Sequence, residues 1–395
     1  MQAGDIKKYI QIYSKGLLED TLSFWLKHSI DEKYGGFIFS LDRDGSILDT
    51  DKPMWIQSRF VWLLSTLYNT VEKKQQWLDL AKHGIDFIEK YGFDKDGRMF
   101  FRVTQDGKGL IKRRYLYSEF FAVLGFAAYA QAAGEESYKE KAVELFEMIQ
   151  KYLNTLGLLL PKGIPGVRDM KNLAIPMMII CVCQQLKNVV EKNYCDKHID
   201  NAIAEIESHI NDQYRCVLEN VGPNGEFIDH FDGRIVTPGH GIEAAWFILH
   251  EALCRDRNLH LINLGCKMVD YCWQIGWDKK YGGILYFKDA RGLPVSEYWH
   301  DMKFWWPQNE TIIATLLAYY LTGDEKYANW HKVAHDWAYR HFPDKEFGEW
   351  FGYLHRDGRL SNTIKGNMWK GPFHLPRMQW YCWKLLQKME IKKNV

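Results

Sequence analysis

Two kinds of helical segment alternate along the chain. In one kind, apolar residues recur at every third or fourth position, which predicts an amphipathic helix with one face in water. In the other kind almost every residue is apolar, and such a helix must be enclosed by protein. The amphipathic segments are 5–28, 74–91, 137–153, 196–214, 259–277 and 324–342, and the apolar segments are 59–71, 119–133, 173–180, 243–254, 311–321 and 378–389.

This alternation predicts a barrel. Two concentric rings accommodate six enclosed and six half-exposed helices, so we expect an all-α protein, an (α/α)6 barrel. The starts of the apolar segments recur at intervals of 54 to 70 residues, which fits one helical hairpin and its loop per repeat. No linker or change of composition interrupts residues 1–395, so we expect one (α/α)6-barrel catalytic domain over the whole chain.

Glycine-rich stretches precede the apolar segments. Asp-Gly pairs such as Asp44-Gly45 and Asp96-Gly97 lie between short apolar runs and predict β-hairpins. Connectivity places all these long loops at one end of the barrel and short turns at the other. Loops on one face of a rigid scaffold are where functional sites are usually built.

One of these entrances to an apolar helix occurs twice in the sequence. The two copies are Trp55-Ile56-Gln57-Ser58-Arg59 and Trp306-Pro307-Gln308-Asn309-Glu310. The same repeat position therefore carries a cation once and a carboxylate once. A cation is unfavourable at the positive end of a helix dipole, so capping does not explain the position.

Composition narrows the functional classes. Lys+Arg is 51 and Asp+Glu is 50, which gives no electrostatic case for nucleic acid or an anionic membrane. No apolar stretch approaches the roughly 18 residues of a membrane span, and the N-terminus lacks a signal sequence. We therefore expect a cytoplasmic protein. The eight cysteines form no CxxC pair and lie mostly in apolar runs, which favours reduced core thiols and no metal site.

The beginnings of the apolar segments would converge on one cavity. Ionisable and aromatic groups gather there, and burial and mutual charge would shift the pKa values of the ionisable ones. For Glu119 and Glu243, a role as helix caps competes equally with a role in the site. The candidates are Arg59, Glu119, Asn172, His240, Glu243, Glu310, His374 and Arg377, beside Trp55, Tyr117, Trp305, Trp306 and Trp369.

Two histidines favour proton transfer at carbon. His240 and His374 lie in Pro- and Gly-rich segments that lead into apolar helices. Imidazoles on two sides of a substrate can remove a proton from one face of a carbon and return one to the other. Arg59 or Arg377 could stabilise the enolate oxygen, and Glu310 could orient a histidine or a hydroxyl group.

Two other classes stay open. Glu119, Glu243 and Glu310 supply enough carboxylates for glycoside hydrolysis, which also occurs on this type of barrel. A barrel that only binds a protein partner is the non-enzymatic alternative. The sequence contains no HExxH motif, no P-loop and no GxGxxG after a strand, so these metal and nucleotide sites are not indicated.

Several motifs in order resemble the N-acylglucosamine 2-epimerase family, from about Tyr34 to Leu386. They are Trp55-x-Gln57-x-Arg59, Pro238-Gly239-His240-x-Ile242-Glu243, Lys303-x-Trp305-Trp306-Pro307-x-x-Glu310 and Lys370-Gly371-x-Phe373-His374-x-Pro376-Arg377. The resemblance implies an (α/α)6 barrel that interconverts sugars at C2 through a ring-opened, enediolate-type intermediate. It also implies that His240 and His374 are the acid/base pair and that Arg59, Glu310 and Arg377 are essential.

The tail around His374 looks more like the N-acetylglucosamine branch than like the cellobiose 2-epimerases or the mannose-type aldose–ketose isomerases. The resemblance therefore implies conversion of N-acetylglucosamine to N-acetylmannosamine, with no required cofactor. It further implies ATP as an allosteric activator, although no phosphate-binding motif places it, and a homodimer. Gln308-Asn309 departs from the His or small residue of many relatives and leaves the fine choice of substrate open.

Overall fold

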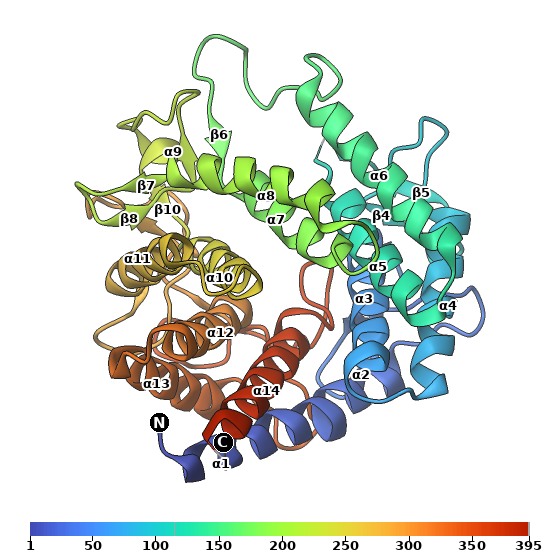
Figure 1. Ribbon diagram of the computed structural model, residues 1–395. Coiled ribbons are helices and arrows are strands. Elements are labelled where there is room, and N and C mark those ends of the chain that lie inside the picture. The colour runs from blue at the N-terminus through green and yellow to red at the C-terminus, as the bar shows by residue number, and fades with distance from the viewer. Residues whose placement is uncertain (114, 394–395) are drawn as a thin grey trace.

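Helices form two concentric rings in the computed structural model, which describes residues 1–113 and 115–393 (Figure 1). The inner helices are α3 (Met54–Thr70), α5 (Tyr117–Ala133), α7 (Ala174–Leu186), α10 (Pro238–Cys254), α12 (Trp305–Thr322) and α14 (His374–Lys393). The outer helices are α1 (Ala3–Lys15), α4 (Gln75–Tyr91), α6 (Glu136–Asn154), α8 (Lys192–Glu207), α11 (Leu259–Gly276) and α13 (Glu325–His341). Each outer helix packs on the inner helix of its own repeat, which confirms the predicted (α/α)6 barrel.

The ring closes where the two ends of the chain meet. Helix α14 packs against α1, and the two lie side by side in Figure 1. Trp380 on α14 meets the Trp62 ring of α3 at 6.0 Å and donates from Nε1 to Thr70 Oγ1 over 2.8 Å. The last inner helix therefore contacts the first.

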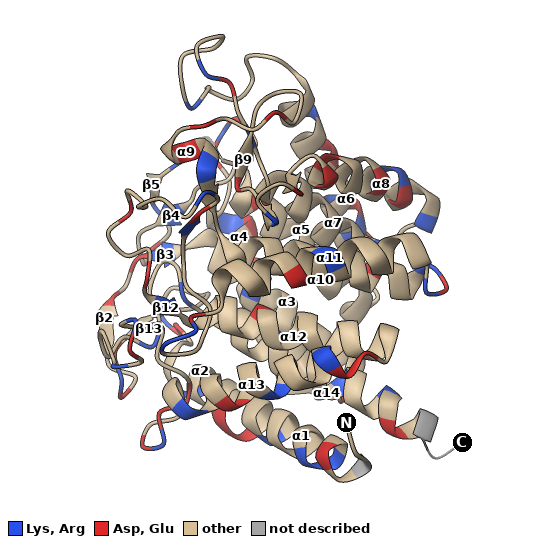
Figure 2. Cartoon of the chain, turned by 90° about the vertical axis from the view of Figure 1, so that its left-hand side faces the viewer, with Lys and Arg blue, Asp and Glu red and all other residues tan. Residues whose placement is uncertain are grey.

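Short antiparallel strands occupy one end of the barrel, as predicted (Figure 2). They pair as β1–β2, β3–β4–β5, β6–β9, β7–β8, β10–β11 and β12–β13. Their bounds are β1 (Ser40–Leu41), β2 (Ile47–Asp49), β3 (Lys52–Pro53), β4 (Arg102–Val103), β5 (Gly109–Ile111), β6 (Lys171–Asn172), β7 (Ile210–Asn211), β8 (Cys216–Val217), β9 (Asn220–Val221), β10 (Ile235–Val236), β11 (Lys288–Asp289), β12 (Lys303–Phe304) and β13 (Tyr353–Leu354).

Several inner helices begin earlier than the apolar pattern predicts. Helix α10 begins at Pro238 instead of Glu243, α12 at Trp305 instead of Thr311, and α14 at His374 instead of Met378. Proline is well tolerated in a first helical turn. Polar residues such as His240, Gln308 and His374 occupy the starts of these helices, so the apolar pattern starts too late. His240 and His374 consequently lie within helices and not before them.

The first amphipathic segment also differs from its prediction. Residues 5–28 form α1, a π-helical turn η1 (Gly16–Thr21) and α2 (Leu22–His28) instead of one regular helix. One further short helix, α9 (Phe231–Arg234), lies in a loop. No helix among residues 1–113 and 115–393 combines the length and apolar character that a bilayer crossing requires.

One buried lysine per loop fastens three of the repeats. Lys52 Nζ lies 2.7 Å from Asp31 Oδ2 and donates to Gly35 O over 2.6 Å. The equivalent contacts are Lys303 with Asp278 (3.2 Å) and Gly282 (2.5 Å), and Lys365 with Asp344 (3.1 Å) and Gly348 (2.5 Å). A charge pair of this kind is tolerated in the interior because hydrogen bonds satisfy the ammonium group.

The repeated glutamines hold the same loops. Gln57 accepts from Phe37 N (2.9 Å) and donates to Phe37 O (2.6 Å). Gln308 does the same with Ile284 at 2.8 and 2.9 Å. The repeated Trp-x-Gln motif is therefore partly structural, because in both copies the glutamine ties a loop to the helix that follows it.

Candidate active site

Charged side chains from four inner helices meet inside the ring. Arg377 Nη2 on α14 lies 2.8 Å from Glu310 Oε1 on α12 and also contacts the carboxylate of Glu243 on α10. Trp246 Nε1 donates to Glu310 Oε2 over 2.7 Å. Burial would lower the pKa of Arg377, but Glu310 and Glu243 more than offset it and raise that pKa. Buried charges persist when they are paired in this way.

Arg59 is the fourth charged member, from α3. Its guanidinium lies over three aromatic rings, at 4.2 Å from Trp55, 3.9 Å from Phe121 and 4.7 Å from Phe373. It makes no ion pair with a described residue, and its Nε has no hydrogen-bond partner. Burial lowers its pKa to about 9, so it remains cationic at neutral pH. Arg59 therefore has donors left for an oxygen atom of a ligand.

His374 lies beside this network as a neutral imidazole. Its Nδ1 is 2.7 Å from Glu310 Oε1 and 3.3 Å from Arg377 Nη2. Burial lowers its pKa well below 6.5, and the nearby arginine charges act in the same direction. Because a carboxylate can only accept, we assign the proton to Nδ1. That tautomer leaves the lone pair of Nε2 free to act as a base.

His240 has the opposite character. Its Nδ1 lies 2.9 Å from Glu219 Oε2. Burial alone would lower the pKa of His240, but the charge and hydrogen bond of Glu219 raise it above 6.5. Burial would raise the pKa of Glu219, but His240, Thr237 and Asn172 lower it to about 2. The Glu219 carboxylate thus stays ionised and favours a protonated His240.

The two histidines face the same space. The Trp306 ring centroid lies 5.1 Å from that of His240 and 5.7 Å from that of His374. The His240 side chain is 29% exposed although it belongs to an inner helix, so part of its ring is accessible. A pair of titratable groups with opposed pKa shifts identifies a candidate acid and a candidate base.

Aromatic residues surround the rest of the site. Trp305 meets His374 at 6.1 Å. Trp55 donates from Nε1 to Met368 O and meets Trp369 at 5.6 Å. Trp369 is 45% exposed and belongs to the rim, and the half-buried Tyr117 packs against Tyr115 at 5.7 Å.

Glu119 is not brought into the charge network. Its Oε1 accepts from Arg98 Nε (2.6 Å) and from Met99 N (3.0 Å). This is the role of Gln57 and Gln308 in their own repeats, so we interpret Glu119 as an anchor for its loop. Its place in the first helical turn made it resemble Arg59 and Glu310, although those two are the sixth residues of their helices.

Asn172 contacts the carboxylate of Glu219, which in turn contacts His240. Its Nδ2 donates to Glu219 Oε1 (3.1 Å), and its Oδ1 accepts from Ala174 N (2.9 Å). It lies on β6, which pairs with β9, and Glu219 immediately precedes β9. Asn172 therefore orients the carboxylate that orients His240.

Sequence reasoning missed Glu219 and Trp246. Glu219 is an acidic residue inside the largely apolar run Cys216–Val221, and a charge in such a run could have served as a signal. Trp246 lies one turn after Glu243 on an apolar helix and is indistinguishable from core by sequence.

The network has the donor set of a metal site. Ligand atoms of Glu243, Glu310 and His374 all lie within 4.8 Å of one another. Arg377 Nη2 contacts all three of these side chains. The guanidinium group thus supplies the positive charge that the carboxylates require.

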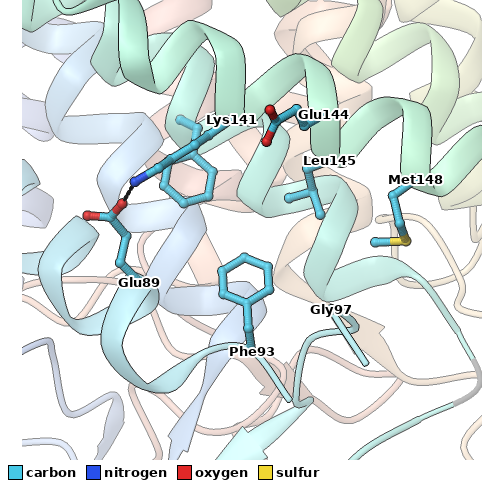
Figure 3. Close-up of a pocket in the computed structure, with 8 residues that line it drawn as sticks. Glu89, Phe93, Gly97, Lys141, Glu144, Leu145 and Met148 are labelled. Carbon is cyan, nitrogen blue, oxygen red and sulfur yellow. Dashed lines mark hydrogen bonds and ion pairs between the residues drawn. The ribbon is translucent and has the colours of Figure 1, made fainter. Parts of the chain in front are cut away.

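A separate crevice lies outside the inner ring, between α4 and α6 (Figure 3). Its volume is about 330 Å³, and an ion pair between Lys141 and Glu89 crosses its rim. The lining is Glu89, Phe93, Gly97, Phe126, Lys141, Glu144, Leu145 and Met148. This lining contains no histidine or arginine and shares no residue with the network around Arg377.

Comparison with known proteins places this geometry in a family. The model of the family "N-acylglucosamine 2-epimerase" matches residues 36–374. The chain belongs to the N-acylglucosamine 2-epimerase family. It is 33% identical to the N-acylglucosamine 2-epimerase of Mus musculus over 97% of this chain and 95% of that protein. It is 24% identical to a cellobiose 2-epimerase of Bacteroides fragilis over 95% of this chain and 98% of that protein.

Solved structures support the same architecture. The cellobiose 2-epimerase from Bacillus thermoamylovorans B4167 superimposes with a TM-score of 0.84 at 22% identity, over 97% of this chain and all of that one. At this level of identity the likeness concerns the fold. Membership of the family makes the chain a carbohydrate epimerase, and therefore an isomerase.

Proposed function

We propose that this protein interconverts N-acetyl-D-glucosamine and N-acetyl-D-mannosamine at C2 of the ring-opened sugar. The observation that carries the proposal is the histidine pair on Trp306, with one pKa lowered and the other raised. The higher identity to an N-acylglucosamine 2-epimerase than to a cellobiose 2-epimerase supports the choice of substrate.

The chemistry begins at an acidic C–H bond. C2 of the open-chain sugar adjoins the C1 aldehyde, so loss of its proton gives an anion delocalised onto the C1 oxygen. Neutral His374 takes the proton at Nε2, and protonated His240 delivers one to the opposite face of C2. For the other epimer the two histidines exchange roles, and no atom is gained or lost overall.

The remaining charged residues stabilise the intermediate. Arg59 and Arg377 face the developing oxyanion. Cations that are already in position in a low-dielectric site stabilise the charge of the transition state and so lower the activation barrier. Glu310 fixes the ring and the tautomer of His374 through the Nδ1 contact. We assign substrate contacts to Trp55, Trp305, Trp306, Trp369, Tyr117 and Glu243.

Other chemistries fit this geometry less well. Glycoside hydrolysis needs one carboxylic acid and one available carboxylate. Here Arg377 engages both Glu243 and Glu310. Cellobiose 2-epimerisation and aldose–ketose isomerisation would use the same histidines, and they remain the alternatives for the substrate.

We propose three further properties: ATP as an allosteric activator, a homodimer and a cytoplasmic location. The first two follow only from the family resemblance, and the third is the expectation from the sequence. The first is tested by the epimerisation rate with and without ATP, the second by the molar mass in solution and the third by cell fractionation. No cofactor is needed for proton transfer between two histidines.

The deciding experiment is incubation with N-acetyl-D-mannosamine in deuterated water. The expected product is N-acetyl-D-glucosamine with deuterium at C2, observed by nuclear magnetic resonance. Absence of turnover with and without ATP contradicts the proposal. A ketose product indicates an isomerase, turnover of cellobiose but not of N-acetylmannosamine indicates a cellobiose 2-epimerase, and free sugar from a glycoside indicates a hydrolase.

A further inference from the structure

Helix α7 offers an uncharged surface to the site. Gln184 on α7 donates to Phe247 O on α10 over 2.9 Å, and Gln185 accepts from Trp62 Nε1 on α3 over 3.0 Å. One contact reaches the neighbouring helix α10 and the other reaches α3, which lies beyond α5, so this face of α7 points into the ring. Cys181 lies on the same face one helical turn nearer the loop end.

The depth of Cys181 follows from the neighbouring helices. Trp62 is three residues after Arg59, and Phe247 is four residues after Glu243. Cys181 precedes Gln184 by three residues and Gln185 by four, which is also one helical turn, so it lies at about the level of Arg59 and Glu243. In agreement, burial raises the pKa of its thiol to about 12, and the charges that act on the thiol belong to Arg377, Glu243, Glu310 and Arg59.

Each inner helix thus contributes one side chain at this level. We call this set the axial layer: Arg59, Phe121, Cys181, Glu243, Glu310 and Arg377. The four charged members come from α3, α10, α12 and α14, whereas α5 and α7 contribute Phe121 and Cys181. Met177 lies one turn from Cys181 on the same face of α7 and is buried. The layer therefore has a charged sector and an apolar sector.

The planar intermediate has three substituents to accommodate. In the proposed reaction the histidines lie at the two faces of C2. The bonds from C2 to C1, to C3 and to the amide nitrogen therefore lie in the plane between them. The C1 oxygen carries negative charge and requires the arginines. The chain from C3 to C6 is the longest and requires the open end of the barrel, where Trp55 and Trp369 lie. The direction left for the amide substituent is the apolar sector.

We propose that the apolar sector binds the N-acyl group and that Cys181 limits the length of the acyl chain. The inference rests on the proposed function and adds to it the residue that distinguishes N-acylated sugars from sugars with a hydroxyl group at C2. A small apolar pocket discriminates one methylene group by roughly 10- to 200-fold. Removal of the sulfur atom therefore creates room for a longer chain.

The test compares acyl-chain preference in Cys181→Ala, Cys181→Val and Cys183→Ala. Cys183 is the matched control because it is buried on the same helix and contacts Cys195 of α8 instead of the site. The substrates are N-acetyl-, N-propanoyl- and N-butanoyl-mannosamine. For Cys181→Ala we expect the ratio of kcat/KM for the butanoyl sugar to that for the acetyl sugar to rise about tenfold or more.

The controls separate the pocket from the reaction. Cys181→Val should lower the same ratio, and Cys183→Ala should leave it within about twofold of the wild-type value. Binding of the matching N-acyl hexosaminitols, which are open-chain and cannot react, is measured in parallel by calorimetry. An unchanged preference in Cys181→Ala overturns the proposal.

Failure of the proposed function would look different. If the wild type binds N-acyl hexosaminitols but exchanges no C2 hydrogen, epimerisation is wrong, and the binding preference of Cys181→Ala still decides the pocket. If the wild type neither binds nor converts any N-acyl sugar, both proposals are wrong.

Discussion

At the scale of the residue, the two histidines differ in the neighbouring groups that set their pKa values. Glu219 holds His240 in a state that favours the proton, whereas burial and two arginines hold His374 without one. In the proposed reaction, this resting protonation state serves proton removal by His374 and proton delivery by His240 for one of the two epimers. The sequence predicted both histidines as candidates, but the opposed pKa shifts depend on Glu219, which lies on a different element.

Single histidine variants should separate exchange of the C2 hydrogen with solvent from inversion of the configuration at C2. In His240→Asn, His374 can still remove the C2 proton of one epimer and return a solvent deuteron to the same face, but no acid remains on the other face. We expect deuterium incorporation into one epimer, with epimerisation reduced about a thousandfold or more. His374→Asn should show the same behaviour with the other epimer. Nuclear magnetic resonance of both sugars in deuterated water measures this, and full activity in either variant would remove that histidine from its role.

Glu219→Gln should shift the pH profile of kcat/KM. With the epimer from which His374 removes the proton, the alkaline limb reports loss of the proton from His240, whose pKa the carboxylate raises. Without that charge, burial dominates, so the limb should move to lower pH. The acid limb, which reports His374, should stay in place. An alkaline limb that does not move contradicts the role of Glu219.

The same pair makes a pH-dependent contribution to stability. The contribution of His240 is lost as pH rises through its raised folded-state pKa. That of Glu219 is lost as pH falls from 4.5 towards its folded-state pKa of about 2. The stabilising effect is therefore largest between about pH 4.5 and 6.5, which unfolding of Glu219→Gln and wild type across pH would reveal.

At the scale of the element, buried polar side chains anchor the loops before α3, α5, α12 and α14. Lys52 is wholly buried and contacts Asp31, which is almost as buried. Lys52→Met leaves that carboxylate without its cation, so we expect a loss of about 3–5 kcal/mol in the free energy of unfolding. Lys332→Met, which removes an exposed i,i+4 pair with Asp336, should cost about 1 kcal/mol or less. Chemical denaturation of both variants measures the difference, and equal losses would contradict the role of the buried lysine.

The elements also show where sequence reasoning succeeds. The alternation of apolar and amphipathic segments predicted the rings because burial on all sides removes polar residues from a helix. It failed at the starts of α10, α12 and α14, where the polar residues His240, Glu310 and His374 belong to the site. It also grouped Glu119 with Arg59 and Glu310, because spacing along the chain does not show which way a side chain points.

At the scale of the whole molecule, the charges are balanced and the proposed substrate is neutral. With 51 basic and 50 acidic residues, long-range attraction should not accelerate the encounter with the sugar. We expect kcat/KM to change by less than about twofold between roughly 50 and 500 mM NaCl, while the denaturation midpoint is followed as a control. A steep salt dependence would indicate an anionic substrate instead. One domain over residues 1–395 and a homodimer stay predictions.

The axial layer also has a consequence for how substitutions can alter the substrate preference of this barrel. A repeat that contributes one side chain to a shared layer can be altered without disturbing its glutamine or lysine anchor, because anchor and layer positions differ. In protein engineering, this restricts a first search for new substrates to six codons on a fixed scaffold. The two positions that carry no charge, Phe121 and Cys181, are the ones at which substitution leaves the catalytic charge balance intact.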